Sequence, residues 1–216
     1  MQARHDDASV RYITERFVQE PEAFAVARAL GERLRPGMQV SVYEGHLLAW
    51  LVRMSGARRV LEIGSFVGYS TLWQASALPE NGQLISLEID ADHAQHTRTH
   101  IENAGLADRA QVMQVDALEY LKRYRGAAFD YVFIDGAKKD YVAYLDALTA
   151  HLTPGAWVIA DNALLFGAFT GVARARVSQA AHTAMTEYHA RMASGDAFDA
   201  VMMPTFEGLL VARKKF

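Results

Sequence analysis

The sequence predicts an α/β fold, in which a doubly wound and mostly parallel sheet carries helices on both faces and ends in an antiparallel strand pair. From residue 59 onward, short apolar runs alternate with stretches of helical periodicity, as in strands joined by crossover helices. The last two apolar runs instead flank a short turn, as antiparallel strands do. Hydrophobic residues make up 51% of the 216 residues and charged residues 22%, which disfavours a disordered chain and a coiled coil.

The elements follow from the periodicity of the apolar residues. Residues 9–55 have the spacing of amphipathic helices, with breaks expected at Gly31, at Pro36-Gly37 and at Gly56. We expect one domain over residues 1–216, with an N-terminal helical cap at 1–56 and the doubly wound sheet at 57–216. Parallel strands are expected at 60–63, 83–88, 110–115, 129–134 and 156–160, helices at 91–104, 117–123 and 138–151, and the final strand pair at 198–203 and 209–213.

Composition excludes several classes of protein. The chain has no cysteine, which excludes disulfide scaffolds, thiolate metal sites and cysteine nucleophiles. Its net charge of -3 gives no overall basic surface for duplex nucleic acid. Residues 1–10 lack the pattern of a signal peptide, and no apolar stretch of about 18 residues is present. We therefore expect a cytoplasmic protein with no membrane partner.

The first strand is followed by a glycine-containing turn. Ligands of open α/β sheets bind beyond the carboxyl ends of the strands, and here Glu62, Gly64 and Gly68 form an E-x-G-x-x-x-G pattern. Such a turn lets the backbone approach a ligand, and the next helix offers free N–H groups. The pattern differs from the G-x-G-x-x-G fingerprint of dinucleotide sites. The alternative is a turn that only packs a helix against a strand.

The next two strands also end in acidic residues. Glu88 ends the second strand, where a carboxylate can accept hydrogen bonds from ribose hydroxyls; the alternative is a solvated loop carboxylate. Asp116, followed by Ala117, comes after the third strand, where its carboxylate could accept from the amine of adenine. Asp116 is equally suited to cap the helix at 117–123, and both roles are compatible.

The fourth and fifth strands end at Asp135 and at Asp161-Asn162. Neighbouring strands would bring these three oxygen ligands together, and such ligands suit a hard divalent cation such as Mg²⁺. Asp and Asn also favour turns, so capping is the alternative. Lys138 follows Asp135 by three residues; a lysine beside a bound cation loses its proton more readily and can act as a base. The alternative is a solvated loop lysine.

Taken together, three motifs resemble one known family. Val60-Leu61-Glu62-Ile63-Gly64-Ser65 with Gly68-Tyr69-Ser70-Thr71, Phe133-Ile134-Asp135-Gly136-Ala137-Lys138, and Ala160-Asp161-Asn162 are similar to the cation-dependent class I O-methyltransferases, which include catechol and caffeoyl-coenzyme A enzymes. The resemblance runs from about Met38 to the C-terminus. It implies the Rossmann-like class I methyltransferase fold with seven strands, S-adenosylmethionine as methyl donor, and Mg²⁺ or another divalent cation such as Mn²⁺ or Ca²⁺.

The resemblance also implies a role for each site residue. Lys138 would be the general base, and Asp135, Asp161 and Asn162 would hold the metal. Glu88 would bind the ribose, and Asp116-Ala117 would face the adenine. The full set of implied donor-binding residues is Val40, Glu62, Gly64, Ser65, Phe66, Gly68, Ser70, Glu88, Ile89, Asp116, Ala117 and Asp135.

The acceptor side is less defined. The sequence has Glu207-Gly208 where the family usually has Asp-Gly, and Tyr188-His189 where Phe-Asn is common. Phe166 and Phe169 could form an aromatic wall for a planar acceptor, or only pack. Arg174 and Arg176 could steer an anionic substrate, or be surface charges. His93, His96 and His100 share one helical face, which we expect to be solvated.

We expect an O-methyltransferase whose acceptor is a catechol-like small molecule with two adjacent oxygens. The first alternative keeps the donor and the metal but methylates 5-hydroxyuridine in tRNA, where basic residues such as Lys122, Arg123 and Arg125 could contact phosphate. An alternative of another class is a non-catalytic nucleotide-binding module, or an oxidoreductase built on the same sheet. Relatives are often dimers, so a homodimer is also expected.

Overall fold

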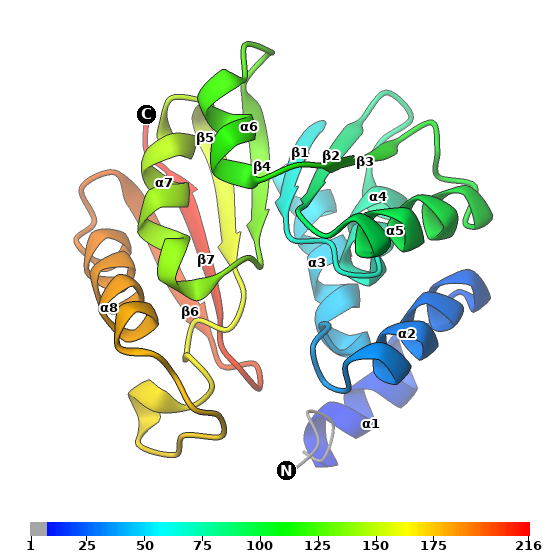
Figure 1. Ribbon diagram of the computed structural model, residues 1–216, viewed down its shortest axis with the longest axis horizontal. Helices are drawn as coiled ribbons and strands as arrows, with labels where there is room; N and C mark the ends of the chain where they lie inside the picture. Colours follow the sequence, from blue (N-terminus) through cyan, green and yellow to red (C-terminus); the bar gives the residue numbers. More distant parts are fainter. Residues whose placement is uncertain (1–7) are drawn as a thin grey trace. The chain divides into compact units, whose positions relative to one another are not determined.

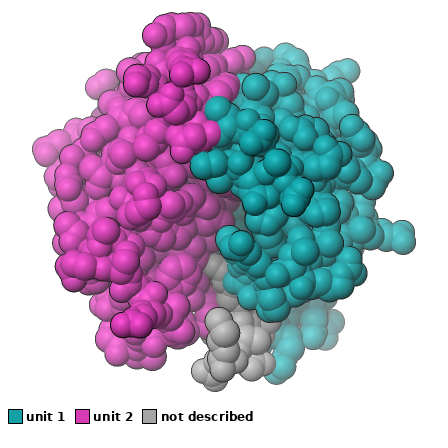
Figure 2. Space-filling model, in the orientation of Figure 1, with its two compact units in different colours: residues 1–58, 65–115 teal, residues 59–64, 116–216 magenta. Residues whose placement is uncertain are grey.

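We analysed a computed structural model of the chain, which describes residues 8–216. The chain divides into two compact units, one of residues 1–58 and 65–115 and the other of residues 59–64 and 116–216 (Figure 2). The division into a cap at 1–56 and a sheet at 57–216 remains a prediction. The expectation for residues 1–10 depends largely on residues 1–7, which lie outside the described residues.

The first unit combines five helices with two strands (Figure 1). Strands β2 and β3 are parallel, and Glu88 at the end of β2 lies opposite Gln114. Helix α5 packs against both strands and α4 against β2, while α3 packs against α4. The elements are α1 (Ala8–Phe17), α2 (Glu22–Leu34), α3 (Val42–Ser55), α4 (Tyr69–Ala77), β2 (Gln83–Glu88), α5 (Ala91–Asn103) and β3 (Ala110–Gln114).

The second unit contains the remaining strands. Strand β4 pairs in parallel with β1 on one side and with β5 on the other, and β7 runs antiparallel to β5 and β6. Helices α6, α7 and α8 pack in succession (Figure 1). The elements are β1 (Arg59–Ile63), α6 (Ala117–Arg123), β4 (Phe129–Ile134), η1 (Lys138–Asp140), α7 (Tyr141–Thr149), β5 (Leu152–Ala160), η2 (Ala168–Thr170), α8 (Gln179–Ala193), β6 (Phe198–Met203) and β7 (Leu209–Lys214).

The strands follow the order β3-β2-β1-β4-β5-β7-β6 in a seven-stranded sheet, so the predicted fold class is confirmed. Five parallel strands come first in the chain and the antiparallel pair last. Strand β5 begins earlier than expected, at Leu152, and the expected helix at 138–151 is a 3₁₀ turn followed by α7. None of the helices within residues 8–216 is long and apolar enough to span a membrane.

Two expectations about the helices were wrong. Gly31 does not break a helix but lies inside α2, where the side chain of Gln39 packs so closely that a Cβ atom would overlap it. The expected solvated stripe of histidines on α5 includes a buried residue, because His100 is 6% exposed and its Nδ1 lies 2.7 Å from the Val67 carbonyl oxygen. In both cases, the environment of the residue is set by a tertiary contact, and such a contact has no effect on the periodicity of the sequence.

The N-terminal helices are fixed by local hydrogen bonds as well as by packing. Helix α3 begins with a capping box, in which the Ser41 hydroxyl accepts from the Glu44 N–H and the Glu44 carboxylate accepts from the Ser41 N–H. The carboxylate of Glu20, ahead of α2, accepts two hydrogen bonds from Arg28 and one from the Tyr69 hydroxyl at the start of α4. These bonds hold α2 against α4 within the first unit.

A substitution at Gly45 tests how tightly α3 packs on α4. A Cβ atom at Gly45 would overlap the indole ring of Trp73, which is rigid and buried. We expect Gly45→Ala to lower the free energy of unfolding by about 1–3 kcal/mol because of this overpacking, although alanine favours helix. Gly31→Ala is the matched control, because its neighbour is the movable end of Gln39, and it should change stability by less than about 1 kcal/mol. Denaturant unfolding of both variants measures this; equal losses would contradict the packing argument.

Candidate functional site

The carboxylates of Asp135 and Asp161 come from neighbouring strands of the second unit. Ile134 at the end of β4 pairs with Ala160 at the end of β5, so the residue after each strand is acidic. The Asp161 N–H donates to the Ile134 carbonyl over 3.0 Å, which continues the ladder past the strand ends. Asp161 is 0% exposed and Asn162 is 5% exposed. The register thus places Asp135, Asp161 and Asn162 at one edge of the sheet, and their role as metal ligands stays a prediction.

Lys138 lies beside Asp135. Its Nζ donates to the Asp135 Oδ1 over 2.9 Å and to the Tyr141 hydroxyl over 2.6 Å. The two charged side chains are only 11% and 20% exposed, so water screens the ion pair weakly. The lysine is therefore held at the edge where the acidic residues lie, and its role as a base stays a prediction.

Tyr141 is a site residue to which the sequence reasoning gave no role. Its hydroxyl lies 3.1 Å from the carbonyl oxygen of Ile134 and 3.0 Å from that of Asp161, so it joins the ends of β4 and β5. Burial raises the pKa of Tyr141 well above its usual value, and the charges of Asp135 and Asp161 raise it further. The phenol therefore stays protonated, and it shares its single O–H between these two carbonyls while it accepts from Lys138. Tyr141 follows Lys138 by three residues, and this spacing is the feature of the sequence that could have indicated a contact between the two.

The backbone after β5 is strained. Asn162, Leu165 and Phe166 have φ values of 51°, 51° and 54°, in the left-handed region that residues other than glycine rarely adopt. Ala163 and Leu164 donate to the carbonyls of Gly208 and Glu207 over 2.9 Å and 2.8 Å. These bonds to the turn between β6 and β7 hold the strained segment in place.

The two departures from the family pattern support this same segment. The Glu207 carboxylate accepts from Arg174 Nε over 3.3 Å, and Arg174 Nη2 donates to the Phe206 carbonyl over 2.7 Å. His189 hydrogen-bonds with the backbone of Ala163, and burial lowers its pKa. Phe169 packs between His182 and His189, with ring centroids 5.0 Å and 4.8 Å away. Phe169 therefore has a packing role, and Arg174 is a structural residue.

Glu88 of the first unit is one of the residues predicted to bind the donor. The Glu88 carboxylate accepts from the N–H groups of Ser65 and Phe66 through Oε2, and from Asp90 through Oε1. It is 7% exposed. Because each carboxylate oxygen has more than one acceptor site, Glu88 can still accept from a ligand, but its first task is to shape the turn.

Glycine is required at two positions of this turn. Gly64 has a φ of 92°, and a Cβ atom there would lie 2.5 Å from the Asp135 carbonyl oxygen. Gly68 has a φ of 86°, and its Cβ would lie 2.9 Å from the side chain of Thr97 on α5. The absence of a side chain at Gly68 therefore allows the start of α4 to lie close to α5.

The remaining predicted donor residues differ in exposure. Val40, Glu62, Ser65 and Ser70 are between 0% and 7% exposed, whereas Ile89 is 66% exposed. Asp116 caps α6, because its carboxylate accepts from the Glu119 N–H over 3.0 Å, so the capping role predicted for it is present. Ala117, next to it, is 8% exposed.

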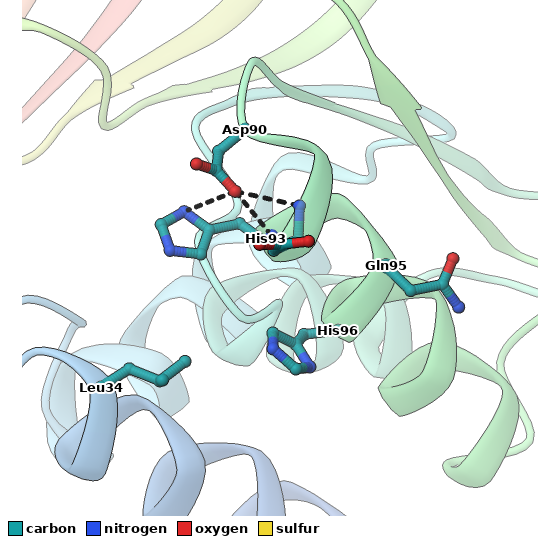
Figure 3. Close-up of a pocket in the computed structure, with 6 residues that line it drawn as sticks. Leu34, Asp90, His93, Gln95 and His96 are labelled. Atoms are coloured by element: carbon teal, nitrogen blue, oxygen red, sulfur yellow. Dashed lines mark hydrogen bonds and ion pairs between the residues drawn. The ribbon is translucent and has the colours of Figure 1, made fainter.

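A pocket of about 270 Å³ lies in the first unit at the start of α5 (Figure 3). Leu34 from α2 lies across from Asp90, His93 and His96. The Asp90 carboxylate already accepts from the N–H groups of Asp92 and His93, so the helix start is capped. None of the predicted site residues lines this pocket.

No group of three or more His, Cys, Asp or Glu side chains within residues 8–216 could hold a metal ion.

Comparisons with known proteins agree with these motifs. The sequence model of a family described as O-methyltransferase matches residues 17–215. The chain is 36% identical over 160 residues to the catechol O-methyltransferase of Niastella koreensis, covering 72% of each protein. It is 29% identical over 222 residues to tricin synthase 1 of Oryza sativa, covering 96% of this chain and 88% of that protein.

Solved structures agree as well. The O-methyltransferase TomG of Streptomyces achromogenes, solved in complex with SAM, matches with a TM-score of 0.85 at 29% identity, with 100% of both chains covered. An O-methyltransferase of Bacillus cereus, solved in complex with SAH, matches with a TM-score of 0.82 at 26% identity, covering 95% and 96%.

The family model spans nearly the whole chain, and the fold with its seven strands is that of the class I methyltransferases. The resemblance seen in the three motifs is confirmed. The prediction that the protein is an enzyme is also confirmed, and the alternative of a non-catalytic nucleotide-binding module is wrong. This chain belongs to the O-methyltransferase family that includes the catechol and caffeoyl-coenzyme A enzymes.

Proposed function

We propose that this protein transfers the methyl group of S-adenosylmethionine to one of two adjacent oxygens of a small catechol-like acceptor, with the help of a divalent cation. One observation carries the proposal. In a chain of the O-methyltransferase family, the register of β4 and β5 brings Asp135 and Asp161-Asn162 to the same edge, next to Lys138.

The residues at this edge suit a hard cation such as Mg²⁺. Carboxylate and amide oxygens are its preferred ligands, and two negative charges offset the charge of the ion. The Nδ2 atom of Asn162 is buried without a hydrogen-bond partner among residues 8–216. A half-turn of that amide would put its oxygen, a suitable ligand, in the same place. Asp135, Asp161 and Asn162 are therefore the residues that would hold the ion.

A divalent cation bound there would supply Lewis acidity, which favours the ionised form of one of two adjacent acceptor oxygens. Lys138 would be the base that takes the proton of that oxygen on Nζ. The oxygen then forms a bond to the methyl carbon while the bond from this carbon to the sulfonium sulfur breaks, and the electron pair stays on sulfur. Opposite charges are neutralised in this step, so alignment of the reactants supplies much of the acceleration.

The donor would be bound by the glycine turn and the acidic strand ends. Glu88 would accept from the ribose hydroxyls, and Asp116-Ala117 would face the adenine. Gly64 would let the backbone approach the methionine end of the donor. The hydrogen bonds from Ser65 and Phe66 to Glu88 support this assignment, because they hold the turn and the carboxylate together before a ligand arrives.

The direct test is methyl transfer from labelled S-adenosylmethionine to catechols, hydroxycinnamoyl thioesters and bulk tRNA, with Mg²⁺ and with EDTA. We expect catechol-type acceptors to be methylated with Mg²⁺ and the reaction to stop with EDTA. Methylation of tRNA alone would favour the tRNA alternative, and full activity in EDTA would exclude the metal.

Asp135→Asn tests the assignment of the site within the chain. It removes a carboxylate from the proposed ligand set and the ion-pair partner of Lys138. We expect kcat to fall by more than about 100-fold, since even residues outside the ligand set commonly cost 10–100-fold. Asp146→Asn, an exposed aspartate on α7 that pairs with Arg191, is the matched control and should stay within about twofold. Equal activity of the two variants would contradict the assignment.

Tyr141→Phe tests the role of the tyrosine as a positioning residue. Loss of the hydroxyl leaves the carbonyls of Ile134 and Asp161 without this donor and Lys138 without one acceptor. We expect kcat to fall about tenfold with little change in the KM for the donor, and the free energy of unfolding to fall by about 1–3 kcal/mol.

Tyr188→Phe is the matched control, because the hydroxyl of this neighbouring buried tyrosine has no hydrogen-bond partner among residues 8–216. Its removal should leave stability unchanged or slightly raised and kcat within about twofold. If Tyr141→Phe behaves like Tyr188→Phe, Tyr141 does not position the lysine.

A further inference from the structure

A second pocket, of about 240 Å³, lies in the second unit beside Lys138. Its volume is below the roughly 300 Å³ at which pockets for drug-sized ligands begin, so it suits a single substituted ring better than a whole coenzyme A thioester. The pocket is lined by Ala137, Lys138, Lys139, Leu165, Phe166, Arg176, Val177, Ser178 and Ala181. Its lining combines apolar side chains with three cationic ones.

The charges that line this pocket are all positive. Two of the three cations have acidic partners, since Lys138 pairs with Asp135 at 2.9 Å and Lys139 pairs with Asp140 at 2.9 Å. Arg176 has no ion pair or hydrogen bond with any residue that the structure describes. Its neighbour Arg174 is instead engaged with Glu207 and Phe206. The guanidinium of Arg176 is therefore the positive charge of this pocket that remains available to a ligand.

One part of the pocket lining is held in a fixed shape. Leu165 and Phe166 are both in the left-handed region of φ, and the Phe166 carbonyl accepts from the Arg174 N–H over 2.7 Å. Arg174 in turn is bound to the turn between β6 and β7. A strained conformation that its surroundings hold in this way favours one pocket shape, so the distance between Lys138 and the segment that carries Arg176 is restricted.

We propose that the natural acceptor carries a carboxylate on the ring that bears its two adjacent oxygens, and that Arg176 binds this carboxylate while Phe166 packs against the ring. This inference rests on the proposed function, because it places the reacting oxygens next to Lys138. A guanidinium matches a carboxylate through two parallel hydrogen bonds. Arg176 is thus a specificity-determining residue, and aromatic acids with vicinal hydroxyls are the substrate class.

The test compares two acceptors of nearly equal size, 3,4-dihydroxybenzoate and the neutral 3,4-dihydroxybenzamide. In the wild type with Mg²⁺, we expect kcat/KM for the acid to exceed that for the amide by about tenfold, the usual effect of one charge-assisted contact. Arg176→Gln should bring this ratio close to one. Arg125→Gln, an exposed arginine whose bonds go only to nearby backbone carbonyls, is the matched control and should keep the wild-type ratio.

Arg176→Glu gives a readout that a merely structural role would not produce. It should reverse the preference, so that the cationic 3,4-dihydroxybenzylamine becomes a better acceptor than the acid. Binding of the unreactive 3,4-dimethoxybenzoate, followed by calorimetry, should weaken in both Arg176 variants and not in Arg125→Gln.

The outcomes separate this inference from the proposed function. If the acid and the amide are methylated equally by the wild type, or if Arg176→Gln keeps the ratio, the inference is wrong while the methyltransferase assignment stands. If no vicinal diol is methylated with Mg²⁺, the proposed function fails, and this inference fails with it.

Discussion

The candidate metal set depends on the parallel register of β4 and β5. Ile134 lies opposite Ala160, so Asp135 and Asp161 follow their strands at the same level of the sheet. A slip by one residue would turn each side chain to the other face and would separate the carboxylates. The C-terminal halves of both strands are buried, with Val132, Phe133, Val158 and Ile159 all 0% exposed, and this packing makes a slip costly. The hydrophobic core thus fixes the spacing of the polar residues.

Tyr141 connects this hydrophobic core to Lys138, the proposed base. Its ring is buried and packs against Tyr188, while its hydroxyl reaches the backbone at the ends of both strands and also Lys138. A single side chain thereby links the strand ends to the proposed base. The segment after β5 is held in a similar way by Arg174, Glu207 and His189. The departures from the family pattern, at 188–189 and 207–208, thus fall at residues that hold the segment after β5 rather than among the proposed metal ligands.

Much of this fold follows from local patterns in the sequence. Buried strands such as Phe129–Ile134 are short and mostly apolar runs, and β2, β4 and β6 have the predicted bounds. Asp135, Asp161 and Asn162 can be identified from the sequence as candidate site residues because they directly follow such runs. The other features depend on contacts between residues far apart in the chain. The sequence predicts a helix break at Gly31 because the contact of this residue with Gln39 has no effect on the periodicity. His100 was expected in solvent because its bond to the Val67 carbonyl is a tertiary one.

The central claim is that Asp135, Asp161 and Asn162 form one cation site, and metal binding measures it without any acceptor. Titration of the purified protein with Mn²⁺, followed by electron paramagnetic resonance, should show a single tight site per chain. Asn162→Ala should weaken that site by about tenfold or more, whereas Asn103→Ala, at the end of α5, should leave it unchanged. A folded wild type that binds no Mn²⁺, or an Asn162→Ala variant that binds it as tightly as the wild type, would contradict the account.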